Sequence, residues 1–153
     1  MKRPVIIIAV IIASLSAGIV LSPAAPTPPT IRALDRAATQ DDFLPEGIPP
    51  LPSEEHTIRL LATADGIRYF VGQTKDAAST CLAIYPDDRP TQWVAGCGQP
   101  TDSREEIVRT GANGIVTAVL VSDDFDTTQL VEEGFKRVHE NIYVIKTTRI
   151  PGA

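Results

Sequence analysis

Two cysteines and two histidines are the residues of this 153-residue chain best suited to redox, nucleophilic or metal chemistry. Cys81 and Cys97 do not form a C-x-x-C motif, so a redox-active pair is disfavoured. A zinc site needs three or four protein ligands, and these four residues do not have the spacing of a zinc motif. His56 and His139 are therefore expected to be solvated surface side chains, and no metal or cofactor is expected.

The other polar residues do not form a known catalytic motif either. The sequence has no G-x-S-x-G nucleophile elbow, no P-loop and no G-x-G-x-x-G run. Paired-carboxylate hydrolysis would need two converging acids, and adjacent acids occur at Asp87–Asp88, Glu105–Glu106 and Asp123–Asp124. Neighbours on a strand point to opposite faces, and acids are common in turns, so we interpret these pairs as turn residues. Asp123–Asp126 lacks the spacing of a calcium loop and is expected to be an acidic, helix-capping turn. No catalytic residue is assigned.

An uncharged apolar run with only two serines as polar groups occupies residues 5–21. About 17–25 apolar residues span the hydrocarbon core of a bilayer, so this run is long enough to cross one. Lys2 and Arg3 precede the run and the next cation is Arg32, which predicts a cytoplasmic N-terminus and an external domain. We interpret the run as a single-pass anchor in the cell membrane. The alternative is a cleaved signal peptide, with residues 22–25 as an imperfect cleavage site, and a secreted protein.

Both cysteines follow this apolar run. Exported thiols meet an oxidising environment, so we predict a disulfide between Cys81 and Cys97, which lie on consecutive predicted strands. Closing a loop of about 15 residues contributes on the order of 3 kcal/mol in the chain-entropy model. That is a large share of a typical domain stability of about 5–15 kcal/mol. Two free thiols are the alternative.

The charge of the chain argues against nucleic-acid binding. Nineteen acidic residues outnumber fourteen Lys and Arg, for a formal net charge of −5. Nucleic acids and anionic lipid surfaces repel such a protein.

Eight prolines occur in residues 22–55, which we predict to be an extracytoplasmic linker. Proline removes backbone donors and favours extended conformations, so the stretch is expected to be a semi-rigid spacer that lifts the domain from the membrane. Within it, residues 30–44 are spaced for a short helix with one apolar face, made of Ile31, Leu34, Ala38 and Phe43. A disordered stretch is the alternative for this segment.

From residue 57 onward the sequence has the period of β-structure. Asp65–Gly66 separates the runs 57–63 and 67–73 and predicts a hairpin, because both positions tolerate positive φ. Further strands are expected at residues 79–85, 91–97, about 107–109, 115–121, 135–138 and 141–148. Short strands spaced by about 8–12 residues are typical of a small antiparallel β-sandwich or barrel.

The run 115–121 is the most apolar of these and is predicted to be the central strand. Asp126 and Gln129 form a weak capping-box pattern, so one helical turn is expected over residues 127–133. The last two strands are expected to form a hairpin about His139–Glu140. The expected inner layer of the domain consists of Tyr69, Phe70, Leu82, Ile84, Trp93, Val94, Ile115, Val119, Val121, Phe135 and Tyr143. The chain thus divides into an apolar segment (1–21), a linker (22–55) and a β-rich domain (56–153).

Several short runs follow one another in a characteristic order around the two cysteines and the single tryptophan: Arg59–Leu61, Asp65–Val71, Cys81–Ile84, Trp93–Gly98, Thr117–Val121 and Glu140–Val144. In this order the sequence resembles a group of small membrane-anchored or secreted actinobacterial proteins of unknown function. The resemblance covers about residues 56–146. It implies an envelope protein and transfers no catalytic residue.

These features predict a membrane-anchored extracytoplasmic domain with a non-enzymatic binding or scaffold role at the cell envelope. Its expected partners are the membrane, through residues 5–21, and an unknown envelope protein or cell-wall component. The rival hypothesis is a small envelope hydrolase with a dispersed site, which would show as a pocket gathering His139 or the acids with a hydroxyl. An exposed apolar patch on a closed surface would favour binding instead. A sensory role is disfavoured because residues 1–4 are too few for a cytoplasmic output.

Overall fold

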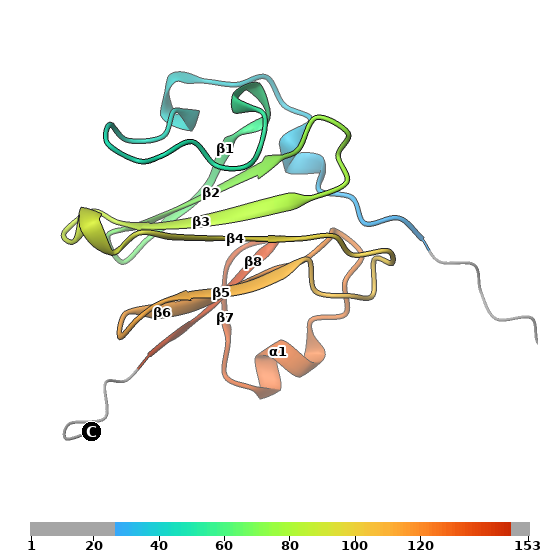
Figure 1. Ribbon diagram of the computed structural model, residues 1–153. Helices are drawn as coiled ribbons and strands as arrows, with labels where there is room; N and C mark the ends of the chain where they lie inside the picture. Colours follow the sequence, from blue (N-terminus) through green and yellow to red (C-terminus); the bar gives the residue numbers. More distant parts are fainter. Residues whose placement is uncertain (1–26, 148–153) are drawn as a thin grey trace, which may run out of the picture.

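The computed structural model describes residues 27–147, which form two four-stranded antiparallel sheets packed face to face (Figure 1). The first sheet has the order β1-β2-β3-β4, with strands at Arg59–Ala64, Ile67–Gln73, Thr80–Pro86 and Val94–Gly98. The second has the order β5-β6-β8-β7, with β5 at Val108–Ala112, β6 at Val116–Leu120, β8 at Ile142–Lys146 and β7 at Lys136–His139. The prediction of a mainly β domain is confirmed.

Local turn chemistry explains the hairpin between β1 and β2. Asp65 and Gly66 adopt φ values of +53° and +72°, and the strands on either side pair antiparallel, with Ala64 opposite Ile67. Two consecutive positive φ values match the right-handed twist of the flanking strands. The predicted Asp-Gly hairpin is confirmed.

Most other predicted elements are present, with shifted ends. The fourth strand starts later than expected because Pro90–Gln92 forms a 3-10 turn, η4. β6 is an inner strand, as predicted for the most apolar run, and β7 and β8 form the predicted final hairpin. The helical turn is α1, Thr128–Glu132.

The predicted capping box at the start of α1 does not form. Asp126 Oδ1 accepts hydrogen bonds from the backbone N–H of Thr128, at 3.0 Å, and from the Thr128 hydroxyl, at 2.7 Å. The Gln129 side chain donates to Glu133 instead of reaching back to the backbone. Asp126 therefore closes a local turn one residue ahead of the helix cap.

The expected single inner layer is wrong, because successive strand residues point to opposite faces. Tyr69 lies between the two sheets, whereas Phe70 lies on the outer face of the first sheet. The buried residues therefore form three clusters: one between the sheets, one on the outer face of the first sheet, and one under α1. Trp93, Val94 and Ile115 are only partly buried.

The described part of the proline-rich segment, residues 27–55, is anchored on the domain at several points and does not stand clear of it as a spacer would. Ile31 is 6% exposed in the cluster between the sheets, and Leu51 is 5% exposed on the outer face of the first sheet. The backbone of this segment is also hydrogen-bonded to the domain, since the N–H of Asp123 donates to the carbonyl of Thr30 at 2.9 Å. Apolar side chains between the prolines cover sheet surface that would otherwise meet water.

The short helix expected over residues 30–44 is also absent. Two separate 3-10 turns occur instead, η1 at Arg32–Leu34 and η2 at Gln40–Asp42, and a third, η3, follows at Glu55–Thr57. Phe43 is 64% exposed, so it does not share an apolar face with the buried Ile31.

The predicted membrane anchor, residues 5–21, lies outside the described residues. Between residues 27 and 147, no helix combines the length and the apolar character needed to cross a membrane.

Candidate functional site

The candidate site is a loop that covers the outer face of the first sheet. We call residues 43–53 the cover loop. Its apolar side chains, above all Leu51 and the half-buried Leu44 and Ile48, pack on Phe70 and Tyr85 of the sheet. In Figure 1 the loop lies above the first sheet, on the side away from α1.

Both ends of the cover loop are held by hydrogen bonds, whereas its middle is held by apolar contacts. After the loop, the N–H of Glu54 donates to the carbonyl of Gln73 at 2.9 Å. The Thr57 hydroxyl donates to the same carbonyl at 2.9 Å and accepts from the Gln73 N–H at 2.8 Å. The loop is thus a strap with two fixed ends.

At the other end, Asp42 is a buried carboxylate with many donors. It receives two hydrogen bonds from the Arg36 guanidinium, at 2.7 and 2.5 Å, and further bonds from the backbone N–H and hydroxyl of Thr39. Its Oδ1 also accepts from the backbone N–H of Leu60 in β1, at 2.7 Å. The hydrogen bonds from Arg36, followed by those from the backbone of Thr39 and Leu60, hold the pKa of Asp42 far below its usual range, although burial opposes this shift.

Two hollows flank Phe43, the most exposed large apolar residue of the described chain. One, of about 270 Å³, lies under the cover loop between Leu44 and Ile58. The other, of about 630 Å³, is wider and includes His56 at its rim. The hydroxyl of Ser53 lines the smaller hollow and is buried without a hydrogen-bond partner among residues 27–147.

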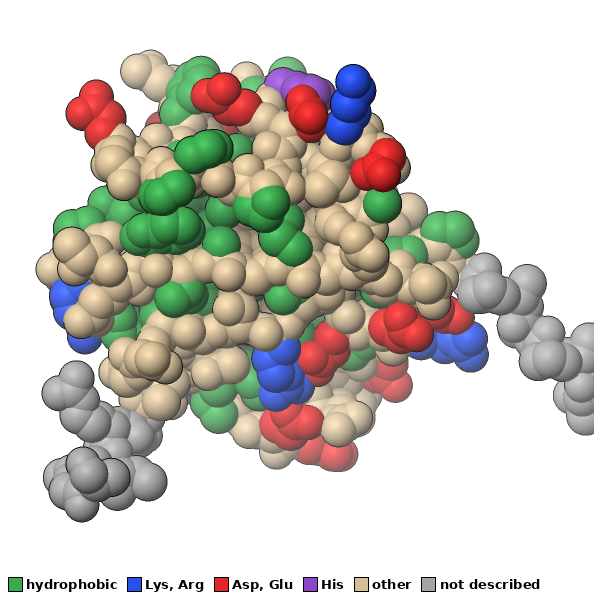
Figure 2. All heavy atoms as spheres, viewed as in Figure 1, with side chains coloured by type: hydrophobic (Ala, Val, Ile, Leu, Met, Phe, Trp, Pro, Cys, Tyr) green, Lys and Arg blue, Asp and Glu red, His purple; other side chains and the backbone are tan. Residues whose placement is uncertain are grey.

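A third hollow, of about 490 Å³, lies where the cover loop meets the start of β4. It is lined by Ile48 and Pro49 of the loop, by Tyr85 of β3 and by Trp93, which lies between η4 and β4. Figure 2 shows hydrophobic side chains gathered around the cover loop and the adjoining edge of the first sheet. The site offers aromatic and aliphatic surface with one free hydroxyl, a combination that binds apolar groups and fixes their orientation.

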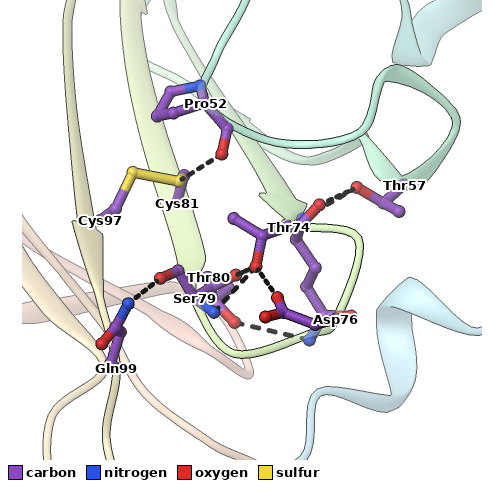
Figure 3. Close-up of a disulfide and its surroundings, with 10 residues drawn as sticks. Pro52, Thr57, Thr74, Asp76, Ser79, Thr80, Cys81, Cys97 and Gln99 are labelled. Atoms are coloured by element: carbon purple, nitrogen blue, oxygen red, sulfur yellow. Dashed lines mark hydrogen bonds between the residues drawn. A yellow bond between two sulfur atoms is a disulfide. The ribbon is translucent and has the colours of Figure 1, made fainter.

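The predicted disulfide between Cys81 and Cys97 is confirmed, and it braces this face. The two residues face each other on β3 and β4, with a Cα–Cα distance of 4.0 Å. Figure 3 shows the Pro52 carbonyl of the cover loop pointing at Cys81 Sγ, from which it is 4.0 Å away. On the other side, the Gln99 side chain donates to the Ser79 hydroxyl at 2.6 Å.

The two histidines belong to different parts of the fold, and only His56 is a solvated surface side chain as predicted. His56 is exposed in η3. His139 is half-buried at the end of β7, where its Nδ1 accepts from the N–H of Asn141 at 3.2 Å. Burial lowers the pKa of His139, and the nearby charges of Glu140 and Asp123 only partly oppose that shift. Among the described residues, no hydrogen bond joins His139 to a hydroxyl group.

The acid pairs are engaged by neighbouring arginines and backbone groups. Most of their carboxylates are paired with arginine: Arg68 with Asp87, Arg89 with Asp88, Arg109 with Glu106, and Arg32 with Asp123. Glu105 accepts from the backbone N–H of Thr101. Within residues 27–147, no group of three or more metal-binding side chains converges. These acids act as turn and ion-pair residues.

Comparison with known proteins identifies no relative. No protein-family model, no curated protein and no solved structure matches this chain. The resemblance to actinobacterial envelope proteins therefore stays a prediction.

The cover loop was not predicted from the sequence, because its prolines are also typical of a spacer. A signal was present, since Leu44, Ile48 and Leu51 recur every three or four residues between the prolines. That spacing places apolar side chains on one side of a compact segment, as packing on a sheet requires.

Proposed function

We propose that this protein is an extracytoplasmic domain with a non-enzymatic binding or scaffold role at the cell envelope, held at the membrane by residues 5–21. The cover loop, together with Trp93, is its binding surface. The partner is an envelope protein or cell-wall component that presents an apolar group.

One observation carries the proposal. Phe43 is 64% exposed and lines two hollows, of which the smaller has mainly apolar walls and the wider also contains Glu54, Glu55 and His56. An aromatic side chain of this size is costly to leave in water, because burying it contributes about 1.5–3 kcal/mol. Its position on a strap fixed at both ends makes it a pre-arranged contact, which lowers the entropy lost on binding.

The compartment is supported by sequence and structure together. The apolar run of residues 5–21 follows two cations, and the single cysteine pair of the chain is bonded. Disulfides of this kind persist in oxidising compartments.

Binding is favoured over hydrolysis by the way the polar groups are used. His139 accepts a backbone hydrogen bond at Nδ1, and the carboxylate of Asp123 is held by Arg32 and Asn141. A general base needs hydrogen-bond reach to the proton that it abstracts. His139 lines neither the hollow of about 630 Å³ at the cover loop nor the hollow of about 500 Å³ on the second sheet, which reaches its neighbour Val138.

The test is affinity capture from envelope extracts with the unchanged full chain and two variants. Phe43→Ala is expected to lose a partner that the unchanged protein retains. Val131→Ala is the matched control, because Val131 is the other large apolar residue exposed in the described chain, at 59%, and belongs to α1. Loss of the partner in both variants, or no partner together with hydrolysis of an envelope substrate, would overturn the proposal.

A further inference from the structure

The four edge strands of the two sheets differ in how they are protected. β1, β5 and β7 each carry at least one charged residue, namely Arg59, Arg109, and Lys136 with Arg137. β4 has the sequence Val-Ala-Gly-Cys-Gly and carries none. Natural sheets usually block their edges with charges, prolines or covering segments, because a bare edge pairs with other strands.

The disulfide shows which way the backbone groups of β4 point. Directly opposed residues of an antiparallel pair are about 5.5 Å apart when they share hydrogen bonds and about 4.5 Å apart when they do not. Cys81 and Cys97 are 4.0 Å apart at Cα, so they form a narrow pair without mutual hydrogen bonds. The N–H and C=O of Cys97 therefore point away from β3, and alternation gives Ala95 the same outward direction.

The same alternation predicts bonds elsewhere in the sheet, and they are present. If Cys81 directs its backbone groups at β2, then those of Gln73 must point away from β3. The N–H of Gln73 indeed donates to Thr57 Oγ1, and its carbonyl accepts from the N–H of Glu54. The assignment of the outward groups of β4 thus rests on more than one distance.

At the opposite edge of the first sheet, outward backbone groups of β1 are covered by side chains. The outward N–H of Leu60 in β1 donates to Asp42, and its outward carbonyl accepts from Arg36 at 3.2 Å. The ion pair of Arg36 and Asp42 thus supplies the hydrogen bonds that a neighbouring strand would make to Leu60. Ala95 and Cys97, by contrast, are exposed, and no hydrogen bond within residues 27–147 reaches their outward groups.

We propose that β4 pairs antiparallel with β4 of a second copy of this chain, about a two-fold axis through Gly96. In this register Ala95 lies opposite Cys97 of the second copy, and the two residues exchange both of their outward hydrogen bonds. By symmetry, Cys97 lies opposite Ala95 of the second copy and exchanges the same two hydrogen bonds. The first sheets of the two copies thereby join into one continuous sheet. This interface is separate from the cover-loop surface and does not depend on its role.

Three features indicate a second copy as the occupant. An antiparallel two-fold pairing brings each strand against itself, and β4 has no charge that would meet its own like charge, although the chain has a net charge of −5. Gly96 would face Gly96, so the backbones can approach closely. Pro90 and Pro100 bracket the strand and confine the register to the residues between them.

Figure 2 is viewed from the side where β4 runs across the front of the molecule in Figure 1. A band of backbone and uncharged side chains crosses the middle of this view, with charged groups above it, below it and at its ends. Between its ends the band shows no charged group.

The interface is small. A five-residue strand covers less than the roughly 800 Å² per partner of a standard stable interface, so the dimer is expected to be weak and concentration-dependent. Attachment of both copies to one membrane would raise their effective concentration.

Hydrogen exchange of the full chain in detergent micelles tests the proposal directly. Between about 50 µM and about 1 mM, a range suited to a weak interface, the amides of Ala95 and Cys97 are expected to become at least several-fold more protected. The amide of Gly96 points at β3 and is expected to be protected equally at both concentrations. Equal, fast exchange of Ala95 and Cys97 at both concentrations would refute the pairing, even if the chain associates through another surface.

A pair of variants isolates the outward hydrogen bonds. Ala95→Pro removes one outward N–H without removing a bond to β3, which proline tolerates on an edge strand. It is expected to abolish the concentration-dependent mass increase in sedimentation and to leave the Cys97 amide fast. Ala95→Ser keeps the N–H and is expected to behave like the unchanged chain. Dimers that persist in Ala95→Pro, or that vanish in both variants, would overturn the proposal; a misfolded proline variant leaves the exchange experiment on the unchanged chain to decide.

Discussion

Replacing Asp42 by asparagine is expected to lower the free energy of unfolding by about 3 kcal/mol. The residue is nearly fully buried, with its side chain 3% exposed, and it joins the segment before the cover loop to β1. Its two oxygens accept five hydrogen bonds from Arg36, Thr39 and Leu60. No other carboxylate in the described chain accepts as many hydrogen bonds.

The magnitude follows from what an amide can replace. The Asn carbonyl can still accept from the N–H of Leu60, but its NH₂ would face the donors that now bond to Oδ2, from Arg36 and from the backbone and hydroxyl of Thr39. Losing two neutral hydrogen bonds costs about 1 kcal/mol each, and losing one to a charged group costs about 1.5–3 kcal/mol. These losses add up to about 3.5–5 kcal/mol, and because Arg36 is 39% exposed and can regain water, the expected total is lowered to about 3 kcal/mol.

The effect depends on pH in a defined direction. The pKa of Asp42 is lowered in the folded state, chiefly by the hydrogen bonds from Arg36. Its contribution is therefore fully present above the unfolded pKa of about 3.9 and is lost as the pH falls below that value. The difference between the unchanged protein and Asp42→Asn is expected to be largest near pH 7 and to shrink below about pH 4.

Urea denaturation of both proteins at several pH values measures this difference. Asp41→Asn is the matched control, because Asp41 is the exposed neighbour in the same 3-10 turn and is expected to stay within about 0.5 kcal/mol of the unchanged protein. A loss below about 1 kcal/mol at pH 7, or an equal loss in the control, would refute the reasoning.

Three further predictions concern stability. Replacing Cys81 and Cys97 together by alanine is expected to cost about 3 kcal/mol in urea denaturation, because the unfolded chain regains the entropy of an open loop; an unchanged midpoint would contradict it. Leu51→Ala is expected to cost about 2–4 kcal/mol, since a 5%-exposed side chain leaves a cavity under the cover loop, whereas a loss under about 1 kcal/mol would mean that the loop is not packed there. Burial lowers the pKa of His139, so folding should lose stability as the pH falls below about 6.5, and His139→Gln should flatten that slope in thermal melts at pH 5–7; an unchanged slope would show that His139 is not its source.

Much of the β-domain was predictable because its signals are local. The Asp65–Gly66 turn needs only two residues that accept positive φ, and the observed values are +53° and +72°. The disulfide was predictable because Cys81 and Cys97 are the only cysteines of the chain. The apolar run of residues 115–121 marked an inner strand because both of its faces are covered.

Which face of a strand packs between the two sheets was not predictable from the sequence of that strand alone. Tyr69 and Phe70 are equally apolar in sequence, yet one lies between the sheets and the other under the cover loop. Alternation says that they point apart, but only the packing of the second sheet determines which face becomes the centre. For the same reason the prolines before β1 indicated a spacer, because the sequence alone does not show the sheet face that Leu51 covers.

The sequence by itself determined the turn positions, the cysteine pairing and the period of the strands, because each depends on neighbouring residues or on composition. The tertiary structure alone decided the partners of Asp42, the path of the cover loop and the bare edge of β4. These depend on contacts between distant segments, such as Asp42 with Leu60 or Leu51 with Phe70, whose geometry no local pattern encodes. The chemistry of β4 is visible in the letters Val-Ala-Gly-Cys-Gly, but its place at an unpaired edge is a property of the folded sheet.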